Sequence, residues 1–185
     1  MINQTLSDAE AKMGKAVDVT REEFATIRAG RANPSMFAKI TADYYGTPTP
    51  IQQLASFTAQ DARTIIVAPF DMGAMAAIEK AIRDSDLGVN PTNDGKTLRC
   101  AFPELTEDRR KEYIKLARGK AEDGRVSVRN IRRSAKQALD KLEKDGEVGK
   151  DDVTGAEKKL DAATKKHTDL IDEMLKNKEA ELLEV

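Results

Sequence analysis

The fold of this chain is decided by residues 107–144, whose sequence is EDRRKEYIKLARGKAEDGRVSVRNIRRSAKQALDKLEK. The stretch contains no proline, and Thr106 precedes it as a suitable N-cap. Apolar and small residues recur in it at steps of three or four, which predicts one amphipathic helix roughly 55 Å long. Its predicted apolar seam consists of Tyr113, Ala117, Ala121, Gly124, Val128, Ile131, Ala135, Ala138 and Leu142.

Two further long helices are predicted on either side of this one in the sequence. Residues 2–28 show the same periodicity and are followed by Gly30 and Pro34, which end a helix. The third helix begins near Asp151 or Asp152, and the short connection before it predicts an antiparallel neighbour. Its predicted seam consists of Val153, Ala156, Leu160, Ala163, His167, Leu170, Met174 and Leu182. Three helices with one apolar stripe each must bury those stripes on one another, which predicts a three-helix bundle.

The stretch between the first and second helices differs, because it contains all six prolines of the chain. Alternating or β-branched runs predict strands over residues 40–45, 63–68 and 96–102, and a short helix over 72–83. Turns are predicted at 46–50 and 93–95. The predicted fold class is therefore α+β: a bundle of residues 1–30 and 106–185, with a small β-rich domain of residues 31–105 inserted into it.

Two chain crossings join the predicted domains, and a double linker favours bending about one axis. We therefore predict a hinge near residues 30–34 and 103–105. Its residues are Gly30, Arg31, Ala32, Asn33, Pro34, Pro103, Glu104 and Leu105.

The composition argues against several classes of protein. Charged residues make up 34% of the chain and aromatic residues 4%, which suits narrow helical seams and not a broad core. Apolar runs are too short to span a membrane, and the N-terminus lacks the pattern of a secretory signal. A single cysteine, Cys100, fits a reducing cytoplasm, and one histidine with one cysteine argues against a usual zinc site.

No group of residues has the pattern of a catalytic site. Gly95-Lys96-Thr97 resembles the end of a phosphate-binding loop, but position 90 is Asn90 where that motif needs glycine. His167 lies on a predicted seam and is expected to be a half-buried histidine with a satisfied hydrogen bond, and Cys100 a small core residue. We expect neither an enzyme nor a cofactor or metal.

The net charge of −1 conceals an uneven distribution of charge. Residues 109–136 contain 11 basic and 3 acidic residues. At 100° per residue, five of these cations fall within about 60° of one another on the predicted helix, and Arg133 lies just beside them. The five are Arg118, Arg125, Arg129, Arg132 and Lys136.

Two interpretations of this basic ridge are open. It is an ordinary solvated helix face whose cations pair with acids on neighbouring helices, or it binds nucleic acid through phosphates without reading bases. Arginine predominates, and its planar guanidinium matches phosphate oxygens. Because aromatic residues are scarce, double-helical RNA or a ribonucleoprotein surface is a better candidate than single strands.

Six segments of the chain resemble bacterial ribosome recycling factors, in the same order and over the whole length. They are Ile27-Arg28-Ala29-Gly30-Arg31-Ala32-Asn33-Pro34, Tyr44-Tyr45-Gly46-Thr47-Pro48-Thr49-Pro50, Ser85-Asp86-Leu87-Gly88-Val89-Asn90-Pro91, Leu105-Thr106-Glu107-Asp108-Arg109-Arg110-Lys111, Val126-Ser127-Val128-Arg129-Asn130-Ile131-Arg132-Arg133 and Lys178-Glu179-Ala180-Glu181-Leu182-Leu183.

The resemblance implies an L-shaped, tRNA-like molecule that acts after translation termination in the cytoplasm. Its implied partners are the 70S ribosome, the 50S subunit with its ribosomal RNA, and elongation factor G, whose GTP hydrolysis drives separation of the subunits. The implied RNA-binding residues are Arg129, Arg132 and Arg133, with Arg28, Arg31 and Arg110 less directly indicated. We expect a monomer with no membrane partner.

Two other classes of function remain open at this stage. A chaperone-like helical rod would bind partners along its apolar seams, in a way that is insensitive to salt. An enzyme with a site between the two domains would need a polar cluster with shifted pKa values in the cleft.

Overall fold

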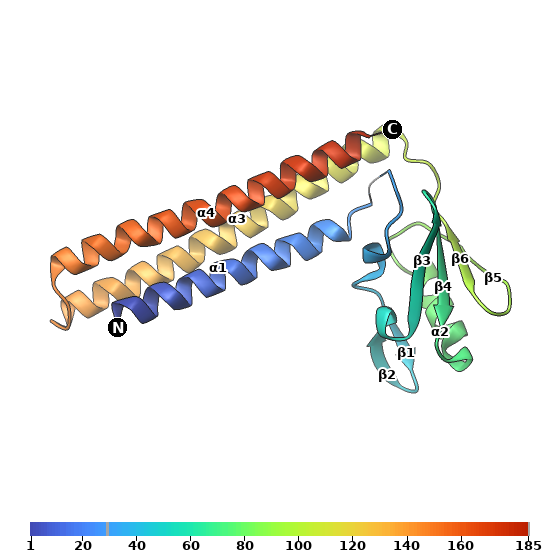
Figure 1. The fold of residues 1–185 in the computed structure, drawn as a ribbon, viewed down its shortest axis with the longest axis horizontal. Coiled ribbons are helices and arrows are strands. Elements are labelled where there is room, and N and C mark those ends of the chain that lie inside the picture. The colour runs from blue at the N-terminus through green and yellow to red at the C-terminus, as the bar shows by residue number, and fades with distance from the viewer. Residues whose placement is uncertain (29, 185) are drawn as a thin grey trace. The chain divides into compact units, whose positions relative to one another are not determined.

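The computed structural model describes residues 1–28 and 30–184, which form two compact units (Figure 1). The first unit consists of Met1–Phe24 with Lys115–Glu179, and the second of Ala25–Ile114 with the C-terminal residues from Ala180. The predicted domain boundaries, after residue 30 and before residue 106, both lie within the second unit, and they stay a prediction.

Three long helices confirm the predicted bundle: α1 (Ile2–Ala25), α3 (Glu107–Lys144) and α4 (Lys150–Leu183). Helix α3 has the predicted bounds, whereas α1 ends three residues earlier than predicted. Ion pairs between Arg118 and Glu179 and between Lys136 and Glu157 show that α3 and α4 run antiparallel. None of the described helices is both long and apolar enough to cross a membrane.

The buried seams follow the predicted ones with two local corrections. Leu139 is buried in α3, whereas the predicted Ala138 is exposed. In α4, Ile171 is buried and the predicted Leu170 is 37% exposed. The buried residue follows the preceding seam residue, Ala135 or His167, by four positions and not by the predicted three. A helix has 3.6 residues per turn, so a long seam must alternate between steps of three and four residues.

Helices α1 and α3 approach closely at Gly124. A Cβ atom at this position would lie 2.3 Å from the Thr20 hydroxyl oxygen on α1 and 3.1 Å from Cδ1 of Ile171 on α4. Thr20 is itself buried, and its hydroxyl donates to the Ala16 carbonyl at 2.9 Å. Glycine at 124 therefore sets how tightly the three helices pack.

The second unit contains a four-stranded antiparallel sheet in the order β3-β4-β6-β5 (Figure 1). Its strands are β3 (Ala55–Asp61), β4 (Thr64–Pro69), β5 (Pro91–Asn93) and β6 (Leu98–Ala101). The predicted helix over 72–83 is present as a short 3-10 turn, Met72–Ala74, followed by α2 (Met75–Arg83). Two more 3-10 turns lie at Pro34–Phe37 and Ile51–Gln53.

The core of this unit forms between the sheet and α2. Register places Ile65 of β4 opposite Cys100 of β6, and Val67 opposite Leu98. All four side chains are buried, together with Ile78 and Ile82 of α2. Cys100 is therefore a core residue, as predicted, and burial raises its pKa to about 12.

The turn predicted at residues 46–50 is wrong, because Thr47–Pro50 forms a strand, β2, paired with β1 (Thr41–Tyr44). The turn is only Tyr45-Gly46, whose φ values of 49° and 85° are both positive. In such a two-residue hairpin, Tyr44 and Thr47 form the first hydrogen-bonded pair, so Pro48 and Pro50 fall at positions that need no N–H donor. Proline is tolerated at those positions of an edge strand.

Two further strands, besides β2, were absent from the sequence-based prediction. Strand β3 is largely exposed and polar, so it lacks the alternation that reveals a strand, and β5 is only three residues long. Both lie at edges of the sheet, where few side chains have to be apolar.

Substitutions at two glycines of α3 should have opposite effects on stability. Gly124→Ala should lower the free energy of unfolding by about 1 to 2 kcal/mol, because the new methyl group overpacks the contact with Thr20. Gly119→Ala should raise it by about 1 kcal/mol, because nothing lies within 4 Å and alanine favours the helix. Urea unfolding followed by circular dichroism measures both, and equal values for the two variants would contradict the close packing at Gly124.

The thiol of Cys100 should be inert in the folded protein. With a pKa of about 12, roughly one thiol in ten thousand is ionised at pH 8, and only the thiolate reacts. Ellman's reagent should therefore leave Cys100 unmodified in native buffer and modify it fully in urea. Ser134→Cys, at an exposed position of α3, provides the reactive control, and rapid modification of the native wild-type chain would contradict the buried core.

Candidate nucleic-acid interface

The basic ridge predicted from the sequence lies on one face of α3, within the first unit. It consists of Arg118, Arg125, Arg129, Arg132, Arg133 and Lys136. Their exposure differs widely: the side chain of Arg118 is 66% exposed and that of Arg125 only 19%. The ridge is therefore partly covered.

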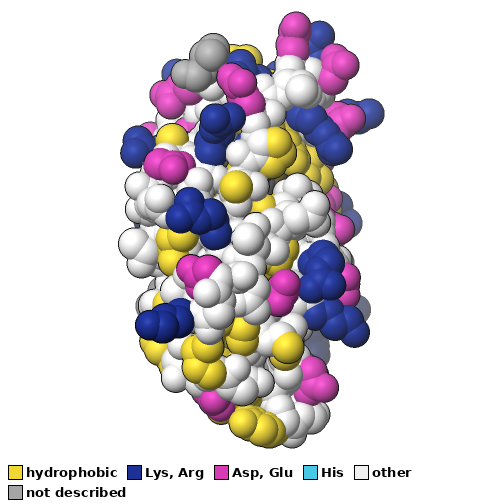
Figure 2. Space-filling model, turned by 90° about the vertical axis from the view of Figure 1, so that its right-hand side faces the viewer, with side chains coloured by type: hydrophobic (Ala, Val, Ile, Leu, Met, Phe, Trp, Pro, Cys, Tyr) yellow, Lys and Arg dark blue, Asp and Glu magenta, His cyan; other side chains and the backbone are white. Residues whose placement is uncertain are grey.

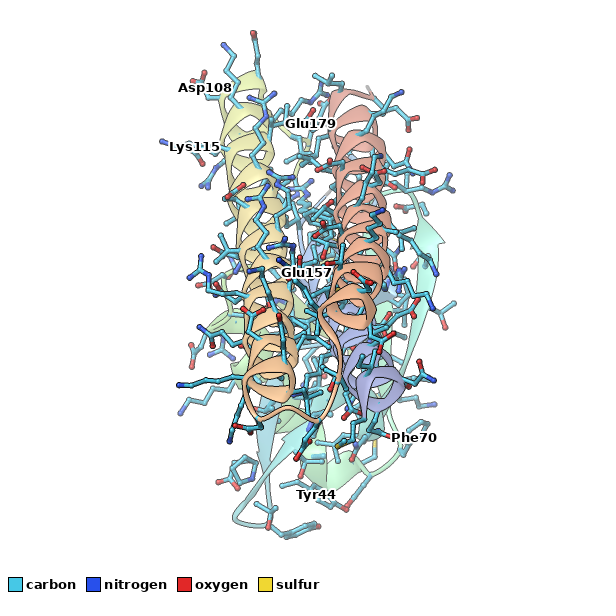
Figure 3. The ribbon with its side chains drawn as sticks, turned by 90° about the vertical axis from the view of Figure 1, so that its left-hand side faces the viewer. Tyr44, Phe70, Asp108, Lys115, Glu157 and Glu179 are labelled. Atoms are coloured by element: carbon cyan, nitrogen blue, oxygen red, sulfur yellow. The ribbon has the colours of Figure 1, made fainter. Side chains whose placement is uncertain are left out.

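The cover comes from carboxylates of α4 (Figure 3). Four ridge cations each pair with one of them, and we call these four pairs the ion-pair ladder. They are Arg118 Nε with Glu179 at 2.6 Å, Arg125 Nη1 with Asp172 at 2.7 Å, Arg132 Nε with Asp161 at 2.7 Å, and Lys136 Nζ with Glu157 at 3.8 Å.

Carboxylates of α3 itself add further pairs. Glu122 contacts Arg125 at 3.1 Å and Arg129 at 3.6 Å, and Asp140 contacts Lys136 at 3.5 Å. Among the described residues, no carboxylate oxygen forms an ion pair with Arg133, which is exposed. Arg129 and Arg133 are therefore the two ridge cations that α4 does not hold.

This geometry bears on both interpretations of the ridge. Pairing with acids of a neighbouring helix, which is the first interpretation, is present for four of the six cations. The pairs are mostly exposed, and exposed pairs contribute only about 0 to 1 kcal/mol each, so a phosphate can replace a carboxylate at small cost. The RNA-binding role of the ridge residues stays a prediction.

The α4 carboxylates were absent from the predicted site, although their spacing in the sequence was a signal for them. Positions 157, 161, 172 and 179 are separated by 4, 11 and 7 residues. All three spacings are close to whole numbers of helical turns, so the four side chains share one face of α4.

Arg28, predicted as a further RNA contact, is buried in the second unit and is 7% exposed. Its Nη2 donates to the Pro103 carbonyl, and its guanidinium lies 5.5 Å from the centroid of the Phe102 ring. Burial lowers its pKa, Tyr113 opposes this shift, and the nearby charge of Arg63 adds to it. In this arrangement the Arg28 side chain connects the segment that follows α1 to the segment that follows β6. The role of Arg28 in RNA binding stays a prediction.

Arg110 is the other predicted contact in the second unit. Its side chain is half-buried. Among the described residues, the Nε atoms of Arg110 and Arg28 are the buried side-chain nitrogen and oxygen atoms that lack a hydrogen-bond partner. Each guanidinium thus keeps one unused donor.

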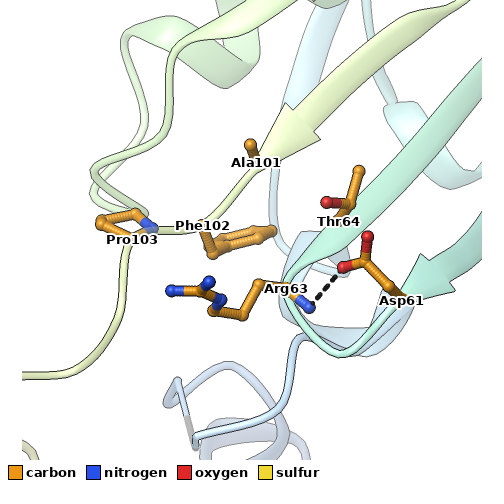
Figure 4. Close-up of a pocket in the computed structure, with 6 residues that line it drawn as sticks. All are labelled: Asp61, Arg63, Thr64, Ala101, Phe102 and Pro103. Atoms are coloured by element: carbon orange, nitrogen blue, oxygen red, sulfur yellow. Dashed lines mark hydrogen bonds between the residues drawn. The ribbon is translucent and has the colours of Figure 1, made fainter.

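A shallow pocket of about 430 Å³ lies in the second unit (Figure 4), and its lining includes Phe102 and Pro103, which both contact Arg28. It is lined by Asp61, Arg63, Thr64, Ala101, Phe102 and Pro103. The backbone N–H of Arg63 donates to Asp61 Oδ1 at 2.9 Å, and this bond is the main cause that lowers the pKa of Asp61. The lining thus mixes one aromatic ring, one cation and one anion.

The predicted hinge residues lie in the second unit and form ordinary backbone contacts. Ala32 N donates to the Ala62 carbonyl at 2.7 Å, and the Asn33 side chain accepts from Ser35 N at 2.9 Å, which caps the turn that Pro34 begins. Ala32 and Leu105 are buried, whereas Arg31, Pro103 and Glu104 are exposed. These contacts leave the hinge a prediction.

A cluster around Asp71 exposes large apolar side chains on the second unit. The hydroxyls of Tyr44 and Tyr45 both donate to Asp71 Oδ2, at 2.9 and 3.3 Å, and the Gly73 N–H donates to Oδ1. These bonds lower the pKa of Asp71. Tyr45 is 79% exposed and Phe70 72%.

Basic and acidic side chains are interspersed on the face of the molecule seen in Figure 2.

The residues that the sequence analysis set aside as catalytic candidates have structural roles. His167 is buried, and its Nδ1 lies 2.7 Å from the Ala163 carbonyl oxygen, which confirms the predicted seam histidine. Gly95-Lys96-Thr97 forms a turn around Asp94, whose carboxylate accepts from the N–H groups of Lys96 and Thr97, so that its pKa falls to about 2. Within residues 1–28 and 30–184, no three His, Cys, Asp or Glu side chains converge to hold a metal ion.

Comparison with known proteins supports the resemblance seen in the sequence. The family model described as ribosome recycling factor matches residues 20–183. A ribosome-recycling factor of Nocardioides sp. is 73% identical and one of Acidothermus cellulolyticus 66% identical, and both alignments cover the whole of each chain.

Two solved structures extend the comparison to the fold. A solution structure of a ribosome recycling factor aligns with a TM-score of 0.79 at 36% identity, over 100% of this chain and 98% of that one. Models for the T. thermophilus ribosome recycling factor, with E. coli elongation factor G bound to the E. coli post-termination complex, align with a TM-score of 0.69 at 40% identity over both whole chains. With a family model over most of its length and relatives matched from end to end, the chain belongs to the ribosome recycling factor family.

Proposed function

We propose that this protein binds the post-termination ribosome in the cytoplasm and, together with elongation factor G and GTP, separates it into subunits. The observation that carries the proposal is membership of the ribosome recycling factor family. A related factor is described with elongation factor G on a post-termination complex, which supports both partners.

The proposed action is mechanical and not enzymatic. The basic ridge of α3 docks on phosphates of large-subunit ribosomal RNA, and the second unit receives force from elongation factor G. The nucleotide is hydrolysed by that partner, so this chain contributes binding energy and shape.

The ridge supports RNA docking through the chemistry of its cations. Five of the six are arginines, whose forked donors match phosphate oxygens. Arg129 and Arg133, which α4 does not hold, are available for the first contacts. Arg118, Arg125, Arg132 and Lys136 follow when phosphates replace their carboxylates.

The hinge is also part of the proposal. We propose that residues 30–34 and 103–105 bend when the second unit is pushed, with the domain boundaries at residues 30 and 106. Two chain segments cross at this place, and such a pair transmits a push better than a single tether does. Interdomain angles that stay fixed in solution scattering of free and ribosome-bound protein would count against it.

Ribosome splitting tests the proposed function as a whole. Light scattering of post-termination 70S ribosomes should fall when this protein, elongation factor G and GTP are added together. Omission of any one of the three should abolish the fall, because docking, force and energy come from different components. Undiminished scattering with all three present would refute the function.

Charge reversal at Arg133 tests the docking surface separately. Arg133→Glu should lower affinity for 50S particles by on the order of tenfold, since it removes a phosphate contact and adds repulsion. Because Arg133 has no ion pair among the described residues, circular dichroism and melting should stay as in the wild type. Lys15→Glu on α1 makes the same change of net charge at another exposed position, and equal losses in the two variants would remove Arg133 from the interface.

A further inference from the structure

We propose that the α4 carboxylates of the ion-pair ladder make RNA binding selective, by masking the basic ridge from RNA that cannot displace them. The residues concerned are Glu157, Asp161, Asp172 and Glu179. This inference rests on the proposed function, because it concerns how the same ridge chooses among RNA surfaces.

At long range, the balance of charge along the ridge decides how strongly RNA is attracted. Among the described residues, five of the six ridge cations, all except Arg133, pair with six carboxylates, so six charges of each sign lie together along the ridge. The carboxylates are Glu122, Asp140, Glu157, Asp161, Asp172 and Glu179. Seen from more than a Debye length, which is about 8 to 10 Å in physiological salt, the ridge is close to neutral. An RNA chain at a distance is therefore attracted weakly, although the sequence of α3 alone is strongly basic.

At short range, close contacts with carboxylates hold the ridge arginines. Arg125 is held from two sides, by Asp172 at 2.7 Å and by Glu122 at 3.1 Å, and its side chain is the most covered of the ladder. Arg132 and Arg118 each present Nε to a carboxylate at 2.6 to 2.7 Å. These contacts hold the guanidinium groups in place beside α4, so part of the conformational entropy of the long side chains is already lost before RNA binds.

RNA phosphates compete with the carboxylates for the ladder cations. A phosphate gains a guanidinium of the ladder only if it approaches closely enough to take the place of the carboxylate. A rigid RNA surface with phosphates at matching spacings can do so at several positions at once. A flexible single strand must order itself as well, so it gains less from each exchange and is left with Arg129 and Arg133.

The four ladder carboxylates are proposed determinants of specificity, and exposed acids that pair within their own helix serve as controls. The test variant is Asp161→Asn with Asp172→Asn, which keeps side-chain size and removes two charges from the ladder. The control variant is Asp18→Asn with Asp169→Asn, where each carboxylate pairs within its own helix, with Arg21 at 2.7 Å and Lys165 at 2.5 Å. All four side chains are more than half exposed, so both variants should fold, which circular dichroism verifies.

Affinities for poly(U) and for 50S particles are measured over a range of salt concentrations. For poly(U), the test variant should bind on the order of tenfold more tightly than the wild type near 0.1 M salt. The salt slope should be steeper by up to about 1.4, since Arg132 loses its α4 carboxylate and Arg125 keeps only Glu122. The control variant should change much less. The affinity of the test variant for 50S particles should rise less than its affinity for poly(U). The ratio of 50S affinity to poly(U) affinity should therefore be lower than in the wild type.

Two results would overturn the masking proposal. One is equal poly(U) binding by the test and control variants, which would show that only net charge matters. The other is a rise in 50S affinity as large as that for poly(U), which would show that the carboxylates weaken all binding alike. Failure of the underlying function has a different signature: undiminished light scattering of 70S ribosomes with this protein, elongation factor G and GTP together, whatever the α4 variants do.

Discussion

The pairing of α3 with α4 is the interaction on which both the stability and the proposed action of this protein depend. The two helices share a narrow apolar seam with α1, and that seam closes tightly at Gly124, where there is no room for a Cβ atom. The ion-pair ladder runs beside the seam and holds the basic side chains of α3 along its length. The same contact that buries the core therefore decides which cations a partner can reach.

This coupling accounts for an apparent contradiction in the sequence. A chain with net charge −1 contains a helix with an excess of eight positive charges over residues 109–136. The fold resolves part of it by bringing the acidic face of α4 against that helix, where four carboxylates pair with four of its cations. The ridge is close to neutral at long range, but it presents closely spaced guanidinium groups at short range. This combination favours docking on one RNA surface with matching phosphates over non-specific binding to any RNA.

The sequence was sufficient for features that depend on periodicity or on local turn chemistry. The bounds of α3, the seam position of His167 and the core position of Cys100 all follow from spacing. It was insufficient where partners come from distant segments: the carboxylates that pair with Arg118, Arg125 and Arg132 lie 29 to 61 residues away. Strand β2 was missed because a segment with two prolines is typical of a turn. Only the pairing with β1 shows that neither proline stands where the strand needs a backbone N–H donor.

The dependence of 50S affinity on salt tests the central claim, that this protein docks through the α3 ridge on RNA phosphates. Arg129 and Arg133 are not held by α4, so at least two phosphate contacts are expected. The logarithm of the binding constant should then fall against the logarithm of salt concentration with a slope of magnitude about 2 or more. A slope near zero would contradict the account and indicate binding through apolar surfaces.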